Sequence, residues 1–149
     1  MSTHKYCEAL DQILELFGTV PELADVTVYD TLPDANPTRE MVAVGTSVTF
    51  HDDWVNFGCF TRETEWTAGG FISTTTPGLT YRESRTRCFD IATAMARALV
   101  RDPRAVTVAG TLMWSSFRLT RFTPYPDTEG SGALIEFEID GKARYSPND

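Results

Sequence analysis

His51, Asp52 and Asp53 place an imidazole directly beside two carboxylates, and all three are groups that bind metal ions. In an extended chain, neighbouring side chains point in different directions and cannot converge on one ion. Structural zinc sites also require spaced pairs of Cys or His, which the sequence lacks. The pattern therefore favours a solvated polar turn at 51–53 over a metal site.

Cys59 and His51 are the other candidate pair, because a thiol nucleophile and its base meet in space and need no fixed spacing. The alternative is a half-buried cysteine without chemistry. Together with Cys7 and Cys88, Cys59 makes three cysteines that stand singly. An odd number of scattered cysteines indicates free thiols in a reducing compartment rather than a disulfide framework.

Two glycine clusters, Gly69-Gly70 and Gly130-Ser131-Gly132, match neither the P-loop nor the dinucleotide fingerprint. We expect both to be turn glycines.

Two pairs of glutamates, Glu63/Glu65 and Glu136/Glu138, are each two residues apart, so each pair shares one face of a strand. Acid/base catalysis needs surroundings that perturb a carboxylate, and a solvated face explains the pairs more simply. We therefore expect no enzyme, no cofactor and no metal site.

Composition limits the classes of protein that remain. The 149 residues fit one domain, 1–149, with 42% hydrophobic and 23% charged residues. No stretch approaches the roughly 18 consecutive apolar residues of a membrane span. The start, Met1–Tyr6, leads into an acidic amphipathic segment, so no secretory signal is expected. A formal net charge of -8 argues against gripping nucleic acid through its phosphates, although an acidic surface can let DNA pass without sticking.

Two helices are predicted. Tyr6, Leu10, Ile13, Leu14 and Phe17 follow the spacing of one helical face, and Gly18 and Pro21 end that helix. Thr80 with Glu83 forms a capping box at the start of the second helix. An apolar stripe then runs from Tyr81 to Leu99, until Asp102-Pro103 stops the helix.

Strands are predicted from runs with period 2 or β-branched residues. These runs are Val26–Tyr29, Val42–Phe50, Phe71–Thr76, Ala105–Leu112, Trp114–Phe122 and Leu134–Ile139, the last with a continuation to Tyr145. Pro124, Pro126, Gly130 and Gly132 are expected in the connection before the last strand. The sequence predicts one α+β domain of order α-β-β-β-α-β-β, a mixed β-sheet covered by two main helices.

Between His51 and Gly70 the pattern loosens and predicts an extended β-hairpin or loop arm. Its aromatic residues are Trp54, Phe57, Phe60 and Trp66, with Arg62 among them. These side chains exceed what the arm can bury by itself, so they form a candidate subunit or partner interface. The alternative, that they pack on their own domain, remains open.

The charges are divided along the chain. Residues 1–40 carry eight acids against two bases, whereas residues 79–104 carry three acids against six bases. Arg87, Arg97 and Arg101 project from the second helix opposite its apolar stripe. Both charged faces could simply be solvated. Alternatively, they meet between copies, because a head-to-tail contact joins unlike patches of identical subunits.

Several stretches resemble the tail terminator proteins of long-tailed (siphovirus-type) bacteriophages, especially those of actinobacterial hosts. The resemblance comprises the helix through Phe17, Val26–Pro33, Met41–Gly45, the helix from Arg87 through Ala92–Leu99 to Asp102-Pro103, and the strand Ile135–Ile139 with Ala143-Arg144-Tyr145. It covers nearly the whole chain as a pattern of elements. The chain departs from the family at 51–66, where Trp54, Phe57 and Phe60 replace a stretch rich in glycine and aspartate.

The resemblance implies a virion protein at the neck of the tail, assembled in the host cytoplasm. It would form a homohexameric ring on the last ring of the tail tube protein, stop tube polymerisation and dock the head-to-tail connector or stopper protein. Genomic DNA would pass through an acidic lumen without specific binding, and no membrane would be involved. Size agrees with a ring, because a compact chain of this length has a radius of gyration of about 15 Å and cannot enclose a duplex alone.

Two alternatives remain from the sequence. One is another neck component, such as a head-completion or stopper protein. The other is a small cytoplasmic enzyme or ligand-binding domain that uses the aromatic arm as a pocket lid.

Overall fold

The structure is a computed structural model that describes residues 5–30, 40–56, 61–75, 80–101, 107–108, 111–127 and 130–145. Its elements are α1 (Lys5–Gly18), the 3-10 helix η1 (Pro21–Leu23), β1 (Thr27–Tyr29), β2 (Glu40–Asn56), β3 (Thr61–Thr75), α2 (Tyr81–Arg101), β4 (Thr107–Val108), β5 (Thr111–Leu112), β6 (Trp114–Asp127) and β7 (Gly130–Tyr145).

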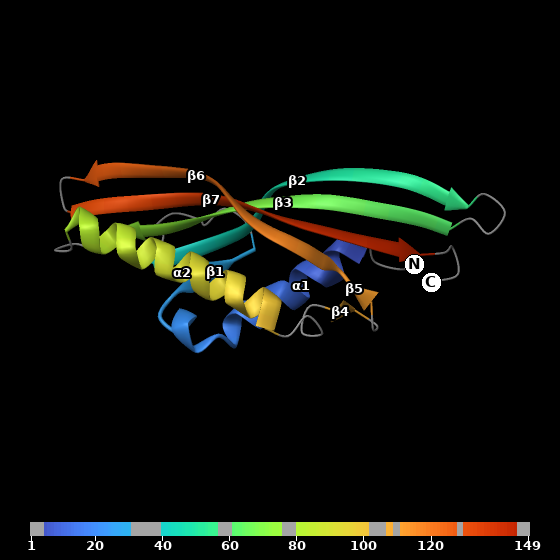
Figure 1. Ribbon diagram of the computed structural model, residues 1–149, viewed down its shortest axis with the longest axis horizontal. Helices are drawn as coiled ribbons and strands as arrows, with labels where there is room; N and C mark the ends of the chain where they lie inside the picture. The colour runs from blue at the N-terminus through green and yellow to red at the C-terminus, as the bar shows by residue number, and fades with distance from the viewer. Residues whose placement is uncertain are drawn as a thin grey trace.

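A five-stranded mixed sheet of order β1-β2-β3-β7-β6 forms one layer, and α1 and α2 form a second layer against one of its faces (Figure 1). All neighbours are antiparallel except β1, which runs parallel to β2 and pairs only with Met41–Ala43. The far end of the β2–β3 hairpin projects beyond the helices (Figure 1). The predicted α+β class, the two covering helices and the hairpin arm are confirmed.

The two helices begin and bury residues as their patterns predict. In α1, Ala9, Ile13 and Phe17 are buried, so the apolar face meets the sheet. At the start of α2, the Glu83 backbone N–H donates a hydrogen bond of 3.2 Å to Thr80 Oγ1, the central contact of the predicted capping box. Cys88 and its apolar neighbours on α2 are buried, so they form the side of the helix that faces the core.

The prediction that Gly69-Gly70 forms a turn is wrong, because both glycines lie inside β3. They pair with β2 where Val44 and Ser47 flank a β-bulge. At Gly70 a Cβ would lie 2.2 Å from the Ala43 carbonyl oxygen, so only glycine allows the two strands to approach there. These glycines therefore mark a close backbone contact in a strand.

Three further predictions differ from the structure in extent. His51 lies within β2, not in a turn, because β2 continues to Asn56. The predicted strand 105–112 contains two strands of two residues, β4 and β5, which pair only with each other among the described residues. The residues predicted to form the connection before the last strand lie in strands instead: Pro124 and Pro126 in β6, at the edge of the sheet where proline is tolerated, and Gly130 and Gly132, also predicted as turn glycines, in β7.

An aromatic cluster joins α1 to the sheet. The rings of Trp66 and Trp114 meet edge to face with centroids 5.8 Å apart, and Tyr6 meets Trp66 in the same way at 5.7 Å. Trp114 Nε1 also donates a hydrogen bond of 2.9 Å to the Ala9 carbonyl oxygen. Because Trp66 comes from β3 and Trp114 from β6, the cluster connects one helix with two strands.

Gly141 of β7 lies between these two tryptophans, and a Cβ there would approach Trp66 Nε1 to 2.4 Å and the Met113 carbonyl oxygen to 2.5 Å. We expect Gly141→Ala to lower the free energy of unfolding by about 1–3 kcal/mol, the usual cost of overpacking. Gly18→Ala is the matched control, since no atom lies within 4 Å of its added Cβ. Urea unfolding midpoints measure both variants. Equal midpoints for the two would contradict this account of the cluster.

Candidate interaction surfaces

The predicted interface residues of the arm are only partly described. Phe57 and Phe60 lie outside the described residues. Trp54 of β2 pairs with Arg62 of β3 near the end of the hairpin, and the structure describes their backbone only. Their role in an interface therefore stays a prediction.

Trp66 belongs to the core of its own domain. Alternate residues of β3 point to the helices, and Thr64, Trp66, Ala68 and Ile72 are all buried on that side. Trp66 is 2% exposed. Its side chain therefore has no surface to offer a partner, which corrects its inclusion among the interface candidates.

Arg87 binds its own chain as well. Its Nε donates to both carboxylate oxygens of Glu40, at 3.0 and 3.1 Å, and its Nη2 donates to Oε2 at 3.0 Å. The hydrogen bonds to Glu40 raise the pKa of Arg87 above its usual value. This bidentate pair fixes α2 to the start of β2. The role of Arg87 in an interface stays a prediction.

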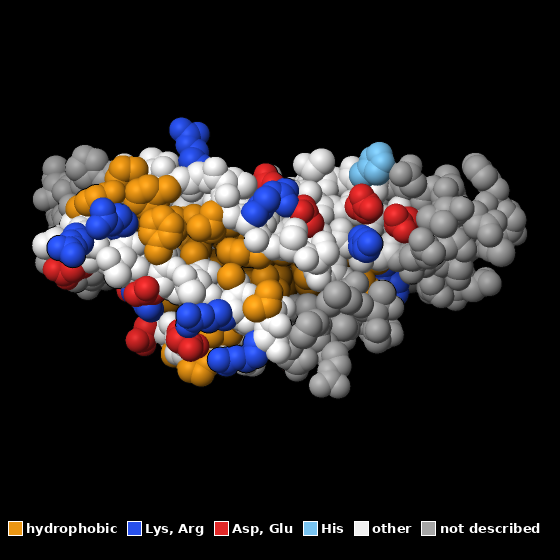
Figure 2. All heavy atoms as spheres, viewed as in Figure 1, with side chains coloured by type: hydrophobic (Ala, Val, Ile, Leu, Met, Phe, Trp, Pro, Cys, Tyr) orange, Lys and Arg blue, Asp and Glu red, His pale blue; other side chains and the backbone are white. Residues whose placement is uncertain are grey.

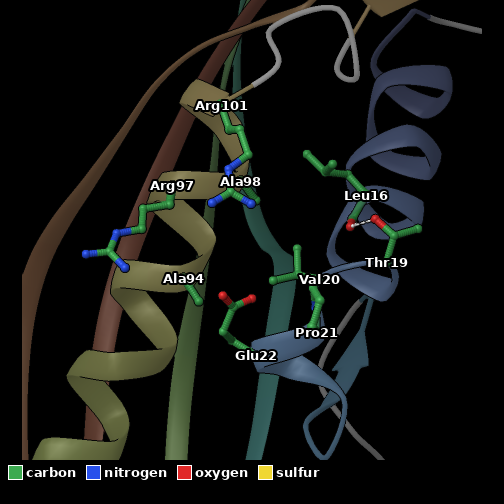
Figure 3. A pocket seen from close by; sticks show the side chains of 9 residues that line it. All are labelled: Leu16, Thr19, Val20, Pro21, Glu22, Ala94, Arg97, Ala98 and Arg101. Atoms are coloured by element: carbon green, nitrogen blue, oxygen red, sulfur yellow. Dashed lines mark hydrogen bonds between the residues drawn. The ribbon is translucent and has the colours of Figure 1, made fainter.

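Arg97 and Arg101 are exposed on the C-terminal half of α2, and they border a hollow of about 260 Å³ between α2 and the α1–η1 corner. Figure 3 shows the Arg101 guanidinium and the Glu22 carboxylate at this hollow, with Leu16 and Val20 on the opposite wall, whereas the Arg97 guanidinium points away from it. Within the described part of the chain, neither arginine has an ion-pair partner.

An apolar band lies on the other flank of α2, between this helix and β6 (Figure 2). It includes Phe89, Val100 and Leu119, which are 39%, 74% and 45% exposed. Phe89 packs on Phe122 of β6 with ring centroids 5.3 Å apart. Patches of exposed apolar side chains at one place mark interaction sites more often than single exposed residues do. Sequence periodicity did not reveal this band, because it is made by two elements distant in sequence.

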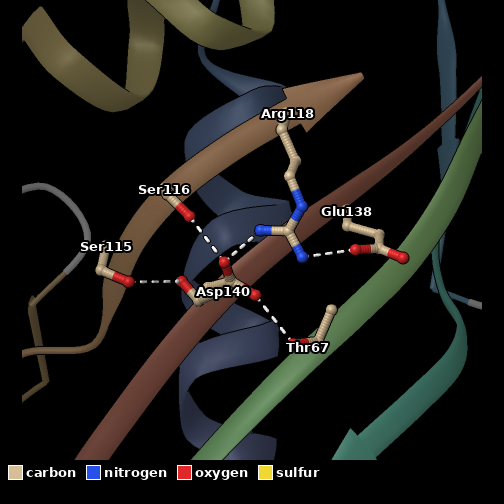
Figure 4. Close-up of polar contacts among 6 residues, drawn as sticks. All are labelled: Thr67, Ser115, Ser116, Arg118, Glu138 and Asp140. Carbon is tan, nitrogen blue, oxygen red and sulfur yellow. Dashed lines mark hydrogen bonds and ion pairs between the residues drawn. The ribbon is translucent and has the colours of Figure 1, made fainter. Parts of the chain in front are cut away.

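The sheet face opposite the helices carries a polar network (Figure 4). Arg118 of β6 forms ion pairs with Glu138 and Asp140 of β7. Thr67 of β3 and Ser116 of β6 each donate a hydrogen bond of 2.8 Å to the Asp140 carboxylate. Three side chains from β3 and β6 thus converge on the carboxylate of Asp140 in β7, a residue that the sequence did not single out. Its only signal is that it continues the i, i+2 series of Glu136 and Glu138.

This face is rich in carboxylates overall. The strand registers place Glu63, Glu65, Glu136, Glu138 and Asp140 on it, and they place the cationic residues Arg118, Arg121, Lys142 and Arg144 on the same face. The glutamate pairs share one face, as predicted. They line an exposed surface on which part of the charge is paired internally.

The described cysteines are free thiols, Cys7 exposed and Cys88 buried. Burial raises the pKa of Cys88 to about 11, so this thiol is a poor nucleophile at neutral pH. Within the described ranges, no group of three or more His, Cys, Asp or Glu side chains is arranged to hold a metal ion. In the same ranges, no helix is both long and apolar enough to cross a membrane. Cys59 lies outside the described residues.

Comparison with known proteins finds similarity at the level of structure. No protein-family model matches the chain, and no curated protein matches its sequence. Among solved structures, the chain is similar to a chain from the virion of a native gene transfer agent particle, with a TM-score of 0.52 and 14% identity over 92% of each chain. The two chains therefore share a fold over nearly their whole lengths.

The Asp140 network predicts a pH dependence. Burial raises the pKa of Asp140, but hydrogen bonds from Arg118, Thr67 and Ser116 outweigh this effect and lower the pKa below its usual value. A lowered pKa stabilises the fold at neutral pH, and the contribution is lost as pH falls below about 4, the usual aspartate pKa, through the folded-state value. Asp140→Asn should therefore lower the unfolding midpoint at pH 7 and approach wild type near pH 3. Asp30→Asn, at an exposed carboxylate outside the network, is the control. A difference between Asp140→Asn and wild type that is independent of pH would contradict the network.

The thiols give a second prediction. In a Cys59→Ser variant at pH 8, a thiol reagent should modify Cys7 at once and Cys88 only after unfolding, because Cys88 is fully buried and its pKa is raised to about 11. Counting modified thiols by mass spectrometry in native and denaturing buffer checks this. Rapid modification of both thiols in the native protein would mean that α2 does not hold Cys88 against the sheet.

Proposed function

We propose that this protein is a structural component of a phage-like virion, and specifically a tail terminator that forms a homohexameric ring on the tail tube. The observation that carries the proposal is the shared fold with a virion chain over 92% of both chains. The resemblance of the sequence elements to tail terminators, from the first helix to the strand ending at Tyr145, supports the finer assignment.

The two faces of the sheet support a ring around a DNA passage. One face is buried under the helices, and the other exposes carboxylates together with Arg118 and Arg121. Arg118 is bound by Glu138 and Asp140 of its own chain, so its charge is not free to hold phosphate. We assign this face to the lumen, because a surface with net negative charge lets DNA pass without binding it.

Several copies must share the passage, because a domain of this size cannot surround a duplex. In the proposed ring, one face contacts the tail tube protein and ends its polymerisation. The other face docks the head-to-tail connector or stopper protein. To end tube polymerisation on one side and bind a different protein on the other, a subunit needs two different surfaces. A chain without internal repeats supplies them.

Electron microscopy of particles lacking this protein tests the proposal. Without a terminator the tube has no stop, so we expect abnormally long tails that are not joined to heads. Labelling the protein in tails made without heads is the companion measurement, and a terminator should be present at the end of each tail. Tails of normal length that lack the label would favour a stopper protein. Particles that form normally without the protein would exclude both roles.

A further inference from the structure

The C-terminal half of α2 combines features of a binding surface. Val100, at 74%, is the most exposed large apolar side chain among the described residues, and the exposed Arg97 and Arg101 lie beside it on the same helix. A hollow of about 260 Å³ lies on one flank of this half-helix, with Ala94 and Ala98 in its wall, and a second of about 130 Å³ lies on the β6 flank. Small side chains next to long cationic ones leave room for side chains of a partner.

A surface of opposite charge lies on α1. Asp11 and Glu15 are exposed, and they project opposite to the buried residues Ala9, Ile13 and Phe17. As for the two arginines, neither carboxylate has an ion-pair partner within the described residues. We call Asp11 and Glu15 the acidic ridge.

The two surfaces also match in spacing. Arg97 and Arg101 are four residues apart, and so are Asp11 and Glu15. Four residues correspond to a rise of about 6 Å along a helix. Two helices packed side by side can therefore pair both arginines with both carboxylates in one register.

These surfaces cannot meet within one copy. The arginines border a hollow whose other wall contains Leu16, on a flank of α1 close to its core-facing side. The acidic ridge projects from the opposite side of the same helix. Pairing therefore requires a second copy of the chain.

We propose that the C-terminal half of α2 in one copy binds the acidic ridge of α1 in a second copy, which deepens the ring proposed above and rests on it. The contact joins unlike patches, the arrangement that builds rings when its rotation closes. Exposed ion pairs are individually weak, so their role is to select the partner and fix the register. Burial of Val100 adds the apolar contribution.

A charge exchange tests this contact in the full-length chain. One variant carries Arg97→Glu with Arg101→Glu, and the other carries Asp11→Arg with Glu15→Arg. Each alone should weaken self-association at least tenfold, because like charges then face each other. An equimolar mixture should restore it, since in alternating copies every contact again joins opposite charges. Sedimentation velocity and native mass spectrometry measure association, and thermal unfolding verifies the folds.

Arg82→Glu with Arg85→Glu is the matched control, because both arginines are exposed at the other end of α2 and the charge change is the same. This control should associate like wild type. Unchanged association in the two test variants, no recovery on mixing, or a wild-type chain that is monomeric at every concentration would each overturn the contact. A complex that stops at two copies would overturn its role in a ring. The particle experiment above decides the virion role separately, because it does not depend on these residues.

Discussion

Burial of one face of the sheet is the constraint on which the rest of this structure depends. Two helices are enough to cover only one side, so apolar side chains must alternate inward along β3 and β7 while polar ones face outward. The cluster of Tyr6, Trp66 and Trp114 holds α1 in this layer. Because the first helix is fixed there, its outer side and the adjoining end of α2 become defined surfaces.

On the face of the sheet opposite the helices, the strands are linked by ion pairs and hydrogen bonds between side chains instead of by apolar contacts. Asp140 receives hydrogen bonds from β3 and β6, and it shares Arg118 with Glu138, so three strands are linked on the side that the helices leave open. Exposed pairs of this kind contribute little stability each. Their larger effect is to keep Arg118 oriented along the sheet, where its charge is paired with carboxylates of its own chain.

The sequence was sufficient for the fold class, both helices and the capping box, because these depend on local periodicity and on hydrogen bonds between near neighbours. It was insufficient where distant segments meet. The pair Gly69-Gly70 has the composition of a turn. Its position inside a strand is explained only by the close approach of the Ala43 backbone to Gly70. Trp66 was taken for an interface residue, but it packs on Trp114, which is 48 positions away. The ion pair of Arg87 with Glu40, 47 positions away, was not predicted either. The apolar band between α2 and β6 was missed for the same reason.

The two prolines of β6 bear on how the open edge of the sheet interacts with other chains. Pro124 and Pro126 lie on an edge strand, where an uninterrupted row of amides would recruit strands from other molecules. Because proline has no N–H group, this end of the edge strand is a poor template for the addition of strands from other molecules. The consequence is that strand addition at this end of the sheet is disfavoured, whatever other surfaces of the molecule bind.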